Sequence, residues 1–232
     1  MGPAQSDPRP PSPIWGKPPV RETVSAAAYR QLREAVLQGQ ISMGARINEL
    51  ELAGAWGVSR TPIRDALRRL EAEGLVQAVP GRGMVVPRLD LADAEELYDL
   101  REVLEGRAAR RAAERATPEL HARLNALIKA FGAAHKQGNI DEMIAIDIDF
   151  HNSLAAASGS ARLQRAIDTV RAQVQQVRLR TMRARGRPAR SLRELARLVA
   201  AVRARDGARA EAVMREHVAS VRTDLSAVMP AS

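Results

Sequence analysis

Three arginines spaced four residues apart, Arg60, Arg64 and Arg68, follow one face of a predicted helix. Guanidinium groups donate paired hydrogen bonds to guanine edges and to phosphate oxygens, so this face could enter the major groove of DNA. A different face of the same helix carries the apolar side chains Ile63, Ala66, Leu67 and Leu70. A solvated charged face is the common alternative for arginines on a helix. The segments on either side favour the DNA interpretation.

A second set of residues, Asp147, His151 and His217, combines side chains that bind transition metals. Asp147 and His151 are one turn apart on the apolar face of a predicted helix, and His217 lies at the centre of the apolar face of a later helix. A carboxylate that faces a core is costly unless it is paired or bound to a metal. The spacing therefore leaves two interpretations, a metal site or a buried hydrogen-bonded Asp–His pair, which is the more common arrangement.

Arg101 also has two interpretations. It shares a predicted helix face with Leu97, Leu104 and Ala108. It could form an ion pair with Glu105, four residues on, as is common on helix surfaces. It could instead clamp the carboxylate of a bound effector, because the guanidinium fork matches carboxylate geometry.

Positive charge is unevenly distributed along the chain. The net charge is +9, to which residues 158–232 contribute +10, residues 20–88 +3 and residues 89–157 −5. The densest group of arginines is Arg178, Arg180, Arg183, Arg185, Arg187 and Arg190. This group fits three roles: a solvated helix end and loop, a supplementary phosphate contact, or attraction of an anionic effector.

The elements around the arginine helix predict a helix-turn-helix. Ser59 suits the N-cap of that helix, where its hydroxyl would accept from a first-turn amide, and Gly74 suits its C-terminal end. A short helix over 49–56 precedes it, opened by an Asn48/Glu51 capping pattern, and a further helix is predicted over 24–38. In such an arrangement the second helix of the motif reads bases.

Two strand-like runs, 75–79 and 84–87, follow the arginine helix. They are joined by Pro80-Gly81-Arg82-Gly83, a hairpin with an arginine at its tip. These glycines lack the spacing of a phosphate-binding loop. The pattern therefore predicts a winged helix-turn-helix with a two-stranded wing.

Segments 32–39, 59–74 and 81–83 resemble the DNA-binding domain of GntR-type bacterial transcription regulators over residues 24–88. The resemblance implies that the exposed start of the arginine helix contacts operator DNA and that the wing tip enters the minor groove. The residues so assigned to DNA binding are Ser59, Arg60, Thr61, Arg64, Gly81 and Arg82. Some members carry an arginine in the first helix of the motif where this chain has Leu50. Arg46, just ahead of that helix, is a candidate replacement as a phosphate contact.

Composition limits the remaining possibilities. The chain has 232 residues, enough for two modest domains, and no cysteine, which excludes disulfides and thiolate metal ligands. Hydrophobic runs are short, so no membrane span is expected. Residues 1–19 are rich in proline and predict a disordered tail rather than a signal peptide. We expect a cytoplasmic protein with a DNA-binding domain over 20–88 and a second domain over 89–232.

The second domain is predicted to be an antiparallel bundle of about six helices, which makes the chain mainly α. The predicted helices are 91–115, 118–136, 139–157, 160–184, 189–204 and 207–228. A winged helix followed by such a bundle resembles the FadR subfamily of GntR regulators, whose bundle is called the FCD domain. Phe150-His151, Ala157-Ser158-Gly159 and the segment 212–217 fit its pattern.

The FCD resemblance bears directly on the metal site. Many FCD domains bind a divalent ion through one Asp and three His, and Asp147, His151 and His217 match three of these positions. The fourth position is Leu195, and His121 and His135 are poorly placed to replace it. Either three protein ligands hold a divalent transition metal such as zinc, completed by water or an effector carboxylate, or the metal has been lost.

Together these features predict a homodimeric transcription regulator, a repressor that binds a short inverted repeat of double-stranded DNA. A small carboxylate metabolite bound near Arg101 would control its operator affinity. One alternative is a constitutive dimeric DNA binder with neither effector nor metal. A second is a metal-dependent bundle enzyme fused to a DNA-binding domain. It is disfavoured because no general base or nucleophile accompanies the Asp/His set, and we expect no enzyme.

Overall fold

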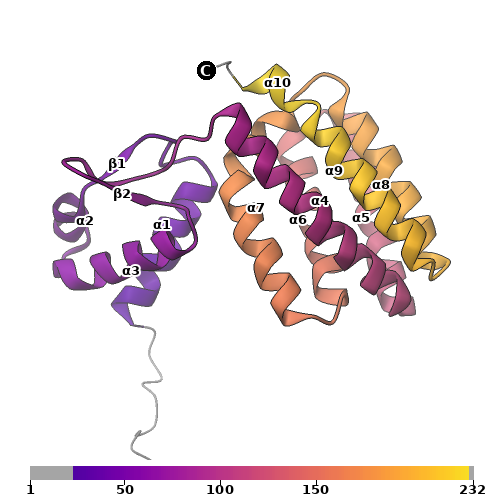
Figure 1. The fold of residues 1–232 in the computed structure, drawn as a ribbon, viewed down its shortest axis with the longest axis horizontal. Coiled ribbons are helices and arrows are strands. Elements are labelled where there is room, and N and C mark those ends of the chain that lie inside the picture. Colours follow the sequence, from indigo (N-terminus) through magenta and orange to yellow (C-terminus); the bar gives the residue numbers. More distant parts are fainter. Residues whose placement is uncertain (1–22, 230–232) are drawn as a thin grey trace, which may run out of the picture.

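The chain folds into a small winged-helix part and a larger helical bundle (Figure 1). The computed structural model describes residues 23–229, so the predicted Pro-rich tail (1–19) lies outside the described residues. The winged-helix part consists of α1 (Val24–Leu37), β1 (Arg46–Ile47), α2 (Glu49–Trp56), α3 (Arg60–Ala72), β2 (Gln77–Val79) and β3 (Gly83–Val85). The bundle consists of α4 (Leu91–Glu114), α5 (Pro118–Gln137), α6 (Ile140–Ala157), α7 (Ala161–Thr181), α8 (Arg187–Arg203), α9 (Gly207–Arg222) and the short α10 (Leu225–Val228).

The winged-helix part has a third strand that the sequence prediction missed. The sheet order is β1-β3-β2, and Arg46 of β1 pairs with Val85 of β3 in an antiparallel register. Two residues are too few to show the alternation of polar and apolar side chains by which strands are predicted. The wing is therefore a hairpin supported by a short strand from the segment before α2.

The apolar face of α3 is the centre of the winged-helix core. Ile63, Leu67 and Leu70 are fully buried and pack against Leu32 of α1. At the end of α3, Gly74 adopts a φ of +72°, which favours a residue without a Cβ. The predicted helix and its C-terminal glycine are thus in place.

The predicted N-cap of α3 needs a correction. Ser59 occupies the N-cap position, but its hydroxyl makes no capping hydrogen bond. A capping side chain normally accepts from the amide of the second or third helical residue. The third residue is Pro62, which has no N–H, so one of the two usual donors is missing. The Ser59 side chain therefore stands exposed at the start of the helix.

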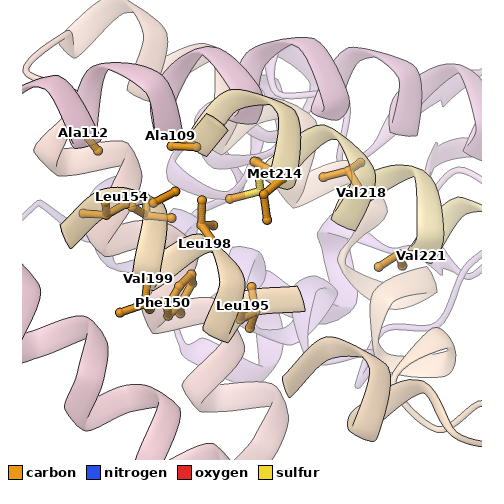
Figure 2. Packing of buried hydrophobic residues seen from close by; sticks show 14 of the residues in the cluster. Ala109, Ala112, Phe150, Leu154, Leu195, Leu198, Val199, Met214, Val218 and Val221 are labelled. Carbon is orange, nitrogen blue, oxygen red and sulfur yellow. The ribbon is translucent and has the colours of Figure 1, made fainter. Parts of the chain in front are cut away.

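The bundle matches the six predicted helices, with differences at two ends. The predicted helix 160–184 ends at Thr181, and the predicted helix 207–228 breaks after Arg222 into α9 and α10. The central helix α4 packs against α9, α7 and α6 around a core of apolar residues. Figure 2 shows Leu195 and Leu198 of α8 within this core, beside Phe150 of α6. In the described residues, no helix has the length and apolar character needed to cross a membrane.

Helix α7 joins the bundle to the winged-helix part. Gln173 Nε2 donates to the carbonyl of Glu73, 2.9 Å away, just after α3. Gln176 Nε2 donates to the carbonyl of Val36, at 2.7 Å, in the last turn of α1. Ala172 of α7 belongs to the apolar core of the winged-helix part. The same helix therefore contacts both of the helices that frame the DNA-binding motif.

Candidate functional site

A basic groove lies between α2, α3 and the wing. It has a volume of about 280 Å³ and is lined by Arg46, Arg60 and Arg64, together with Leu50 of α2 and Gly83 of the wing. The structure thus brings three of the predicted DNA-binding arginines together on one surface. Arg46 comes from β1, so the strand that was not predicted is the element that positions this side chain.

Glu49 holds the two arginines of α3 in this groove. Its Oε2 accepts from Arg64 Nε at 3.0 Å and from Arg60 Nη2 at 3.3 Å. Partial burial alone would raise the pKa of Glu49, but the hydrogen bonds from Arg64 and Arg60 lower it below its usual value. Both arginine side chains remain about half exposed, at 55% for Arg60 and 50% for Arg64. Their remaining N–H groups can reach a polyanion from the solvent side.

The other residues predicted to bind DNA are also exposed. Ser59 and Thr61 lie at the start of α3, and Gly81 and Arg82 form the tip of the hairpin. The amide of Arg82 donates to the carbonyl of Val79 at 3.0 Å, which closes the turn. Gly81 has a φ of +75°, so a side chain there would strain the backbone. The tip therefore presents one arginine on a tight and exposed turn.

A second site lies inside the bundle. Asp147, His151 and His217 are buried, and one ligand atom from each lies within 4.8 Å of the others. Asp147 and His151 come from α6, as predicted, and His217 comes from α9. Within the described part of the chain, His121 and His135 do not belong to this cluster. The three residues that the sequence singled out are thus brought together.

A carboxylate stands behind each histidine. Glu105 Oε2 of α4 lies 2.6 Å from His151 Nδ1, and Glu194 Oε2 of α8 lies 2.8 Å from His217 Nδ1. A carboxylate facing Nδ1 favours a proton on that nitrogen and leaves Nε2 with its lone pair, as in many metal sites. His151 Nε2 lies 3.6 Å from Asp147 Oδ1. Within residues 23–229, neither of these two buried atoms has a hydrogen-bond partner.

These features fit a divalent metal ion held by three protein ligands. Unpaired buried polar atoms are rare, and an ion between them would account for both. Leu195 is 1% exposed and lies in the apolar core (Figure 2), so α8 supplies no fourth ligand at that position. A metal bound here would keep at least one coordination position open to a small molecule.

Three arginines donate to the two most deeply buried carboxylates of the site, Glu105 and Asp147, and Glu194 is a third carboxylate beside His217. Arg101 Nε donates to Glu105 at 2.9 Å, and Arg171 donates to both oxygens of the same carboxylate at 3.0 and 2.7 Å. Arg178 donates to Asp147 Oδ2 through Nε, at 3.1 Å, and through Nη2. The predicted Arg101–Glu105 pair is present, but it is buried, at 2% and 1% exposure. In the described residues, Arg101 Nη1 has no hydrogen-bond partner.

The electrostatics of the site are dominated by these contacts. Burial alone would raise the pKa of Glu105, but Arg171 and Arg101 hold it well below its usual value. Burial has the same tendency at Asp147, where Arg178 instead keeps the pKa well below its usual value. Both carboxylates are therefore ionised, and buried arginines compensate their charge.

The dense arginine group divides into buried and exposed members. Arg178 is bound to Asp147, and Arg187 is 1% exposed, with hydrogen bonds to Ser191 at 3.0 Å and Ser220 at 2.8 Å. In contrast, Arg180, Arg183 and Arg185 are exposed. The predicted role as a solvated helix end therefore fits only the exposed members.

Sequence reasoning missed the site roles of Glu105, Arg171, Arg178 and Glu194. A signal was present for two of them. Arg171 and Arg178 are seven residues apart and fall on the same face as the buried Val174. Charged residues at the buried positions of a helical repeat indicate a polar network in the core. Glu194 has no comparable signal, because it lies at the edge of the buried face of α8.

Comparison with known proteins gives two domain matches. Residues 24–86 match the family described as bacterial regulatory proteins, gntR family. Residues 96–220, more than half of the chain, match the FCD domain. The two matches correspond to the winged-helix part and to the bundle.

Similar proteins include bacterial transcription regulators. An HTH-type regulator of Agrobacterium vitis, from the TAR-I ttuE-ttuC' intergenic region, is 35% identical over 136 residues, which are 57% of this chain and 80% of the relative. The HTH-type transcriptional repressor RspR of Escherichia coli strain K12 is 27% identical over 86% of this chain and 88% of its own length. The solved structure of E. coli McbR/YncC has the same fold, with a TM-score of 0.75 and 23% identity over 88% of this chain and 98% of that one.

Proposed function

The chain belongs to the GntR family of regulators with an FCD domain, and we propose that a small organic acid bound in its bundle controls its affinity for an operator. One observation carries this proposal. Among the residues that the structure describes, Arg101 Nη1, Asp147 Oδ1 and His151 Nε2 have no hydrogen-bond partner, and they are buried in a bundle attached to an exposed basic surface. Unpaired polar atoms in a core are costly and are retained where a ligand completes them. We further assign the chain to the FadR subfamily.

The winged-helix part, residues 20–88, would be the DNA reader. Arg60, Thr61 and Arg64 would contact bases and backbone in the major groove, and Arg82 would enter the minor groove. Ser59 and Arg46 would contact phosphates, since both side chains are exposed beside the start of α3. In the free protein, Glu49 orients the side chains of Arg60 and Arg64. DNA phosphates would compete with Glu49 for both arginines and draw them away from it.

In the bundle, residues 89–232, Asp147, His151 and His217 would hold a divalent transition metal such as zinc. A bound metal would supply positive charge and an open coordination position for a carboxylate. Arg101 would donate from Nη1 to the same carboxylate, because its Nε is already occupied by Glu105. Glu105 and Glu194 would fix the two imidazole rings in position. Arg101 Nη1, buried and without a hydrogen-bond partner in the described residues, favours an anionic ligand over a neutral one.

The regulator would act as a homodimer and, like the relative named a repressor, would switch transcription off. Two readers related by a two-fold axis would match a short inverted repeat. Ligand binding in the bundle would change the relative position of the readers. The contacts between α7 and the winged-helix part would transmit this change from the bundle to the reader.

The test is a binding assay on the full-length, untagged protein. An operator is first selected from a random duplex pool, and its affinity is then measured with and without Zn²⁺ and a panel of mono-, di- and tricarboxylic acids. At least one acid should change the affinity by about ten-fold, within the usual range of allosteric coupling. Arg101→Met should abolish the response, whereas Arg123→Met, at an exposed ion pair, should keep it. Failure of every acid would overturn the proposal.

A second function is favoured by one specific observation. The cavity at the site measures only about 10 Å³, and the position where the FCD resemblance implies a fourth ligand is the buried Leu195. A cavity of this size holds about one water. The alternative is a constitutive dimeric binder whose bundle serves only dimerisation. Elemental analysis and the acid panel together decide between them, because this alternative requires protein without stoichiometric metal and an operator affinity that no acid changes. The enzyme alternative is not retained, since the family and relatives are transcription regulators.

A further inference from the structure

We propose that Arg178 is the gate of the buried site and that ligands enter through the groove between α1 and α7. The inference rests on the proposed function for the identity of the ligand, a small carboxylate. It goes beyond that function by naming the route, the residue that closes it, and the helix that transmits its opening.

A wide groove separates the winged-helix part from the bundle. Its volume is about 930 Å³, and it is lined by Arg33 and Leu37 of α1, Ala145 and Asn152 of α6, and Arg171 and Arg178 of α7. It is large enough for a metabolite, and most of its wall belongs to the bundle. The α1–α7 groove is thus a space to which both parts of the molecule contribute.

Arg178 lines both this groove and the small cavity at the metal-ligand cluster. The small cavity is also lined by Arg101, Asp147 and His217. The Arg178 side chain is only 6% exposed, and its guanidinium is bound to Asp147 Oδ2. It therefore stands between the two spaces, and the ion pair with Asp147 holds it there.

The chemistry of the gate selects for anions. When a carboxylate arrives from the groove, Arg178 can exchange Asp147 for the ligand and remains paired throughout. A neutral or cationic molecule would leave a buried guanidinium without a partner, which is strongly unfavourable. The exchange also frees Asp147 Oδ2 from Arg178, so that this oxygen can serve in the Asp147/His151/His217 cluster. Arg178 therefore both controls the entry of ligands and selects for anionic ones.

Opening of the gate would reach the DNA reader through α7. Arg178 faces the site, whereas Gln173 and Gln176 of the same helix donate to the carbonyls of Glu73 and Val36. Glu73 immediately follows the recognition helix α3, and Val36 lies near the end of α1. A displacement of α7 that follows Arg178 would move these two contacts directly.

The test measures how accessible the buried histidines are, without any need for metal or effector. The chelated full-length protein is treated with diethyl pyrocarbonate, and the modification of each histidine is followed by mass spectrometry. His121 and His135 lie outside the site and serve as internal references. Arg178→Gln should speed the modification of His217 relative to His121 by about ten-fold or more, because the barrier to entry loses an ion pair.

A matched pair of substitutions locates the route. Ala145 and Ala156 are both exposed alanines of α6, but Ala145 lines the α1–α7 groove and Ala156 lines a different one. In the Arg178→Gln background, Ala145→Trp should return the modification of His217 towards the wild-type rate, and Ala156→Trp should not. If Arg178→Gln does not fold, Asp147→Asn breaks the same ion pair from the other side.

The outcomes are distinct for the gate and for the proposed function. An unchanged His217 rate in the Arg178 variant, a parallel rise at His121, or equal effects of the two tryptophans would each overturn the gate. If the variants label as expected but the operator affinity of the wild-type protein does not respond to any acid, the proposed function would be overturned and the gate would stand.

Discussion

The winged-helix part and the bundle treat their charged residues in opposite ways. In the winged-helix part, Arg60 and Arg64 are about half exposed and share one surface carboxylate. In the bundle, Arg101, Arg171 and Arg178 are 2–8% exposed, and each donates to a buried carboxylate. The basic groove keeps its charges available to solvent, and the site inside the bundle encloses them.

This difference in exposure has a consequence for mutations. Residues of the basic groove act in DNA binding but contribute little to folding, whereas residues of the buried network serve both the site and the stability of the fold. An exposed ion pair contributes little to folding, so residues of the basic groove can be changed without unfolding the protein. A buried arginine that loses its carboxylate is strongly destabilising. We therefore expect substitutions in the groove to affect DNA binding alone, and substitutions in the buried network to affect folding first.

The largest effect is expected for Glu105→Gln. Glu105 receives Arg101 and Arg171 and faces His151, so its loss leaves buried positive charge without compensation. The free energy of unfolding, measured by urea titration, should fall by about 3–5 kcal/mol. Glu114→Gln on the same helix removes an exposed partner of Arg110 and should cost less than about 1 kcal/mol. Similar losses for the two variants would contradict the contrast between buried and exposed ion pairs.

The two regions also differ in how far sequence could predict them. Apart from Arg46, the reader residues lie close together along the chain, at 59–64 and 81–82, and local signals define their elements. Helix periodicity, capping residues and a hairpin are enough to place them. The Ser59 cap failed for a local reason, the missing N–H of Pro62. β1 was missed because two residues show no periodicity.

The buried site depends on long-range packing, which sequence patterns do not show. Asp147, His151 and His217 could be named because an apolar face made each of them conspicuous. Glu105 looked like half of a surface ion pair, and only the packing of α6 and α7 against α4 shows that it faces His151 and Arg171. Residues from α4, α6, α7, α8 and α9 meet at this point. Periodicity indicates which face is buried, but not which side chain lies opposite.

Removal of metal should sharpen the contrast between the regions. At a metal concentration of 100 times the dissociation constant, a native-state site adds about 2.7 kcal/mol of stability. Chelation should therefore lower the thermal midpoint of the metal-loaded protein. His217→Ala should abolish this response, and His121→Ala, outside the cluster, should retain it. A midpoint that chelation leaves unchanged would indicate that the network is held by its arginines alone.

The next effect is confined to the reader. Arg60→Ala should weaken binding to the selected operator by about 1–3 kcal/mol and reduce the preference over a scrambled duplex. Because Arg60 is exposed, the free energy of unfolding should change by no more than about 0.5 kcal/mol. Fluorescence anisotropy and urea titration measure the two quantities on the same preparation. Intact operator preference would show that α3 has been placed wrongly on DNA, and a large loss of stability would break the proposed separation.

The smallest effect is expected at Leu50, where the basic groove has an exposed apolar residue. Leu50 is 66% exposed at the start of α2, beside Arg60 and Arg64. Leu50→Arg would add one cation at the groove. If it meets a phosphate, the slope of log affinity against log salt should steepen by about 0.9, on operator and scrambled DNA alike. Ala156→Arg adds the same charge on α6 of the bundle and should leave the slope unchanged. Equal slopes for the two variants would place α2 away from the DNA backbone, because net charge alone would then account for any gain in affinity.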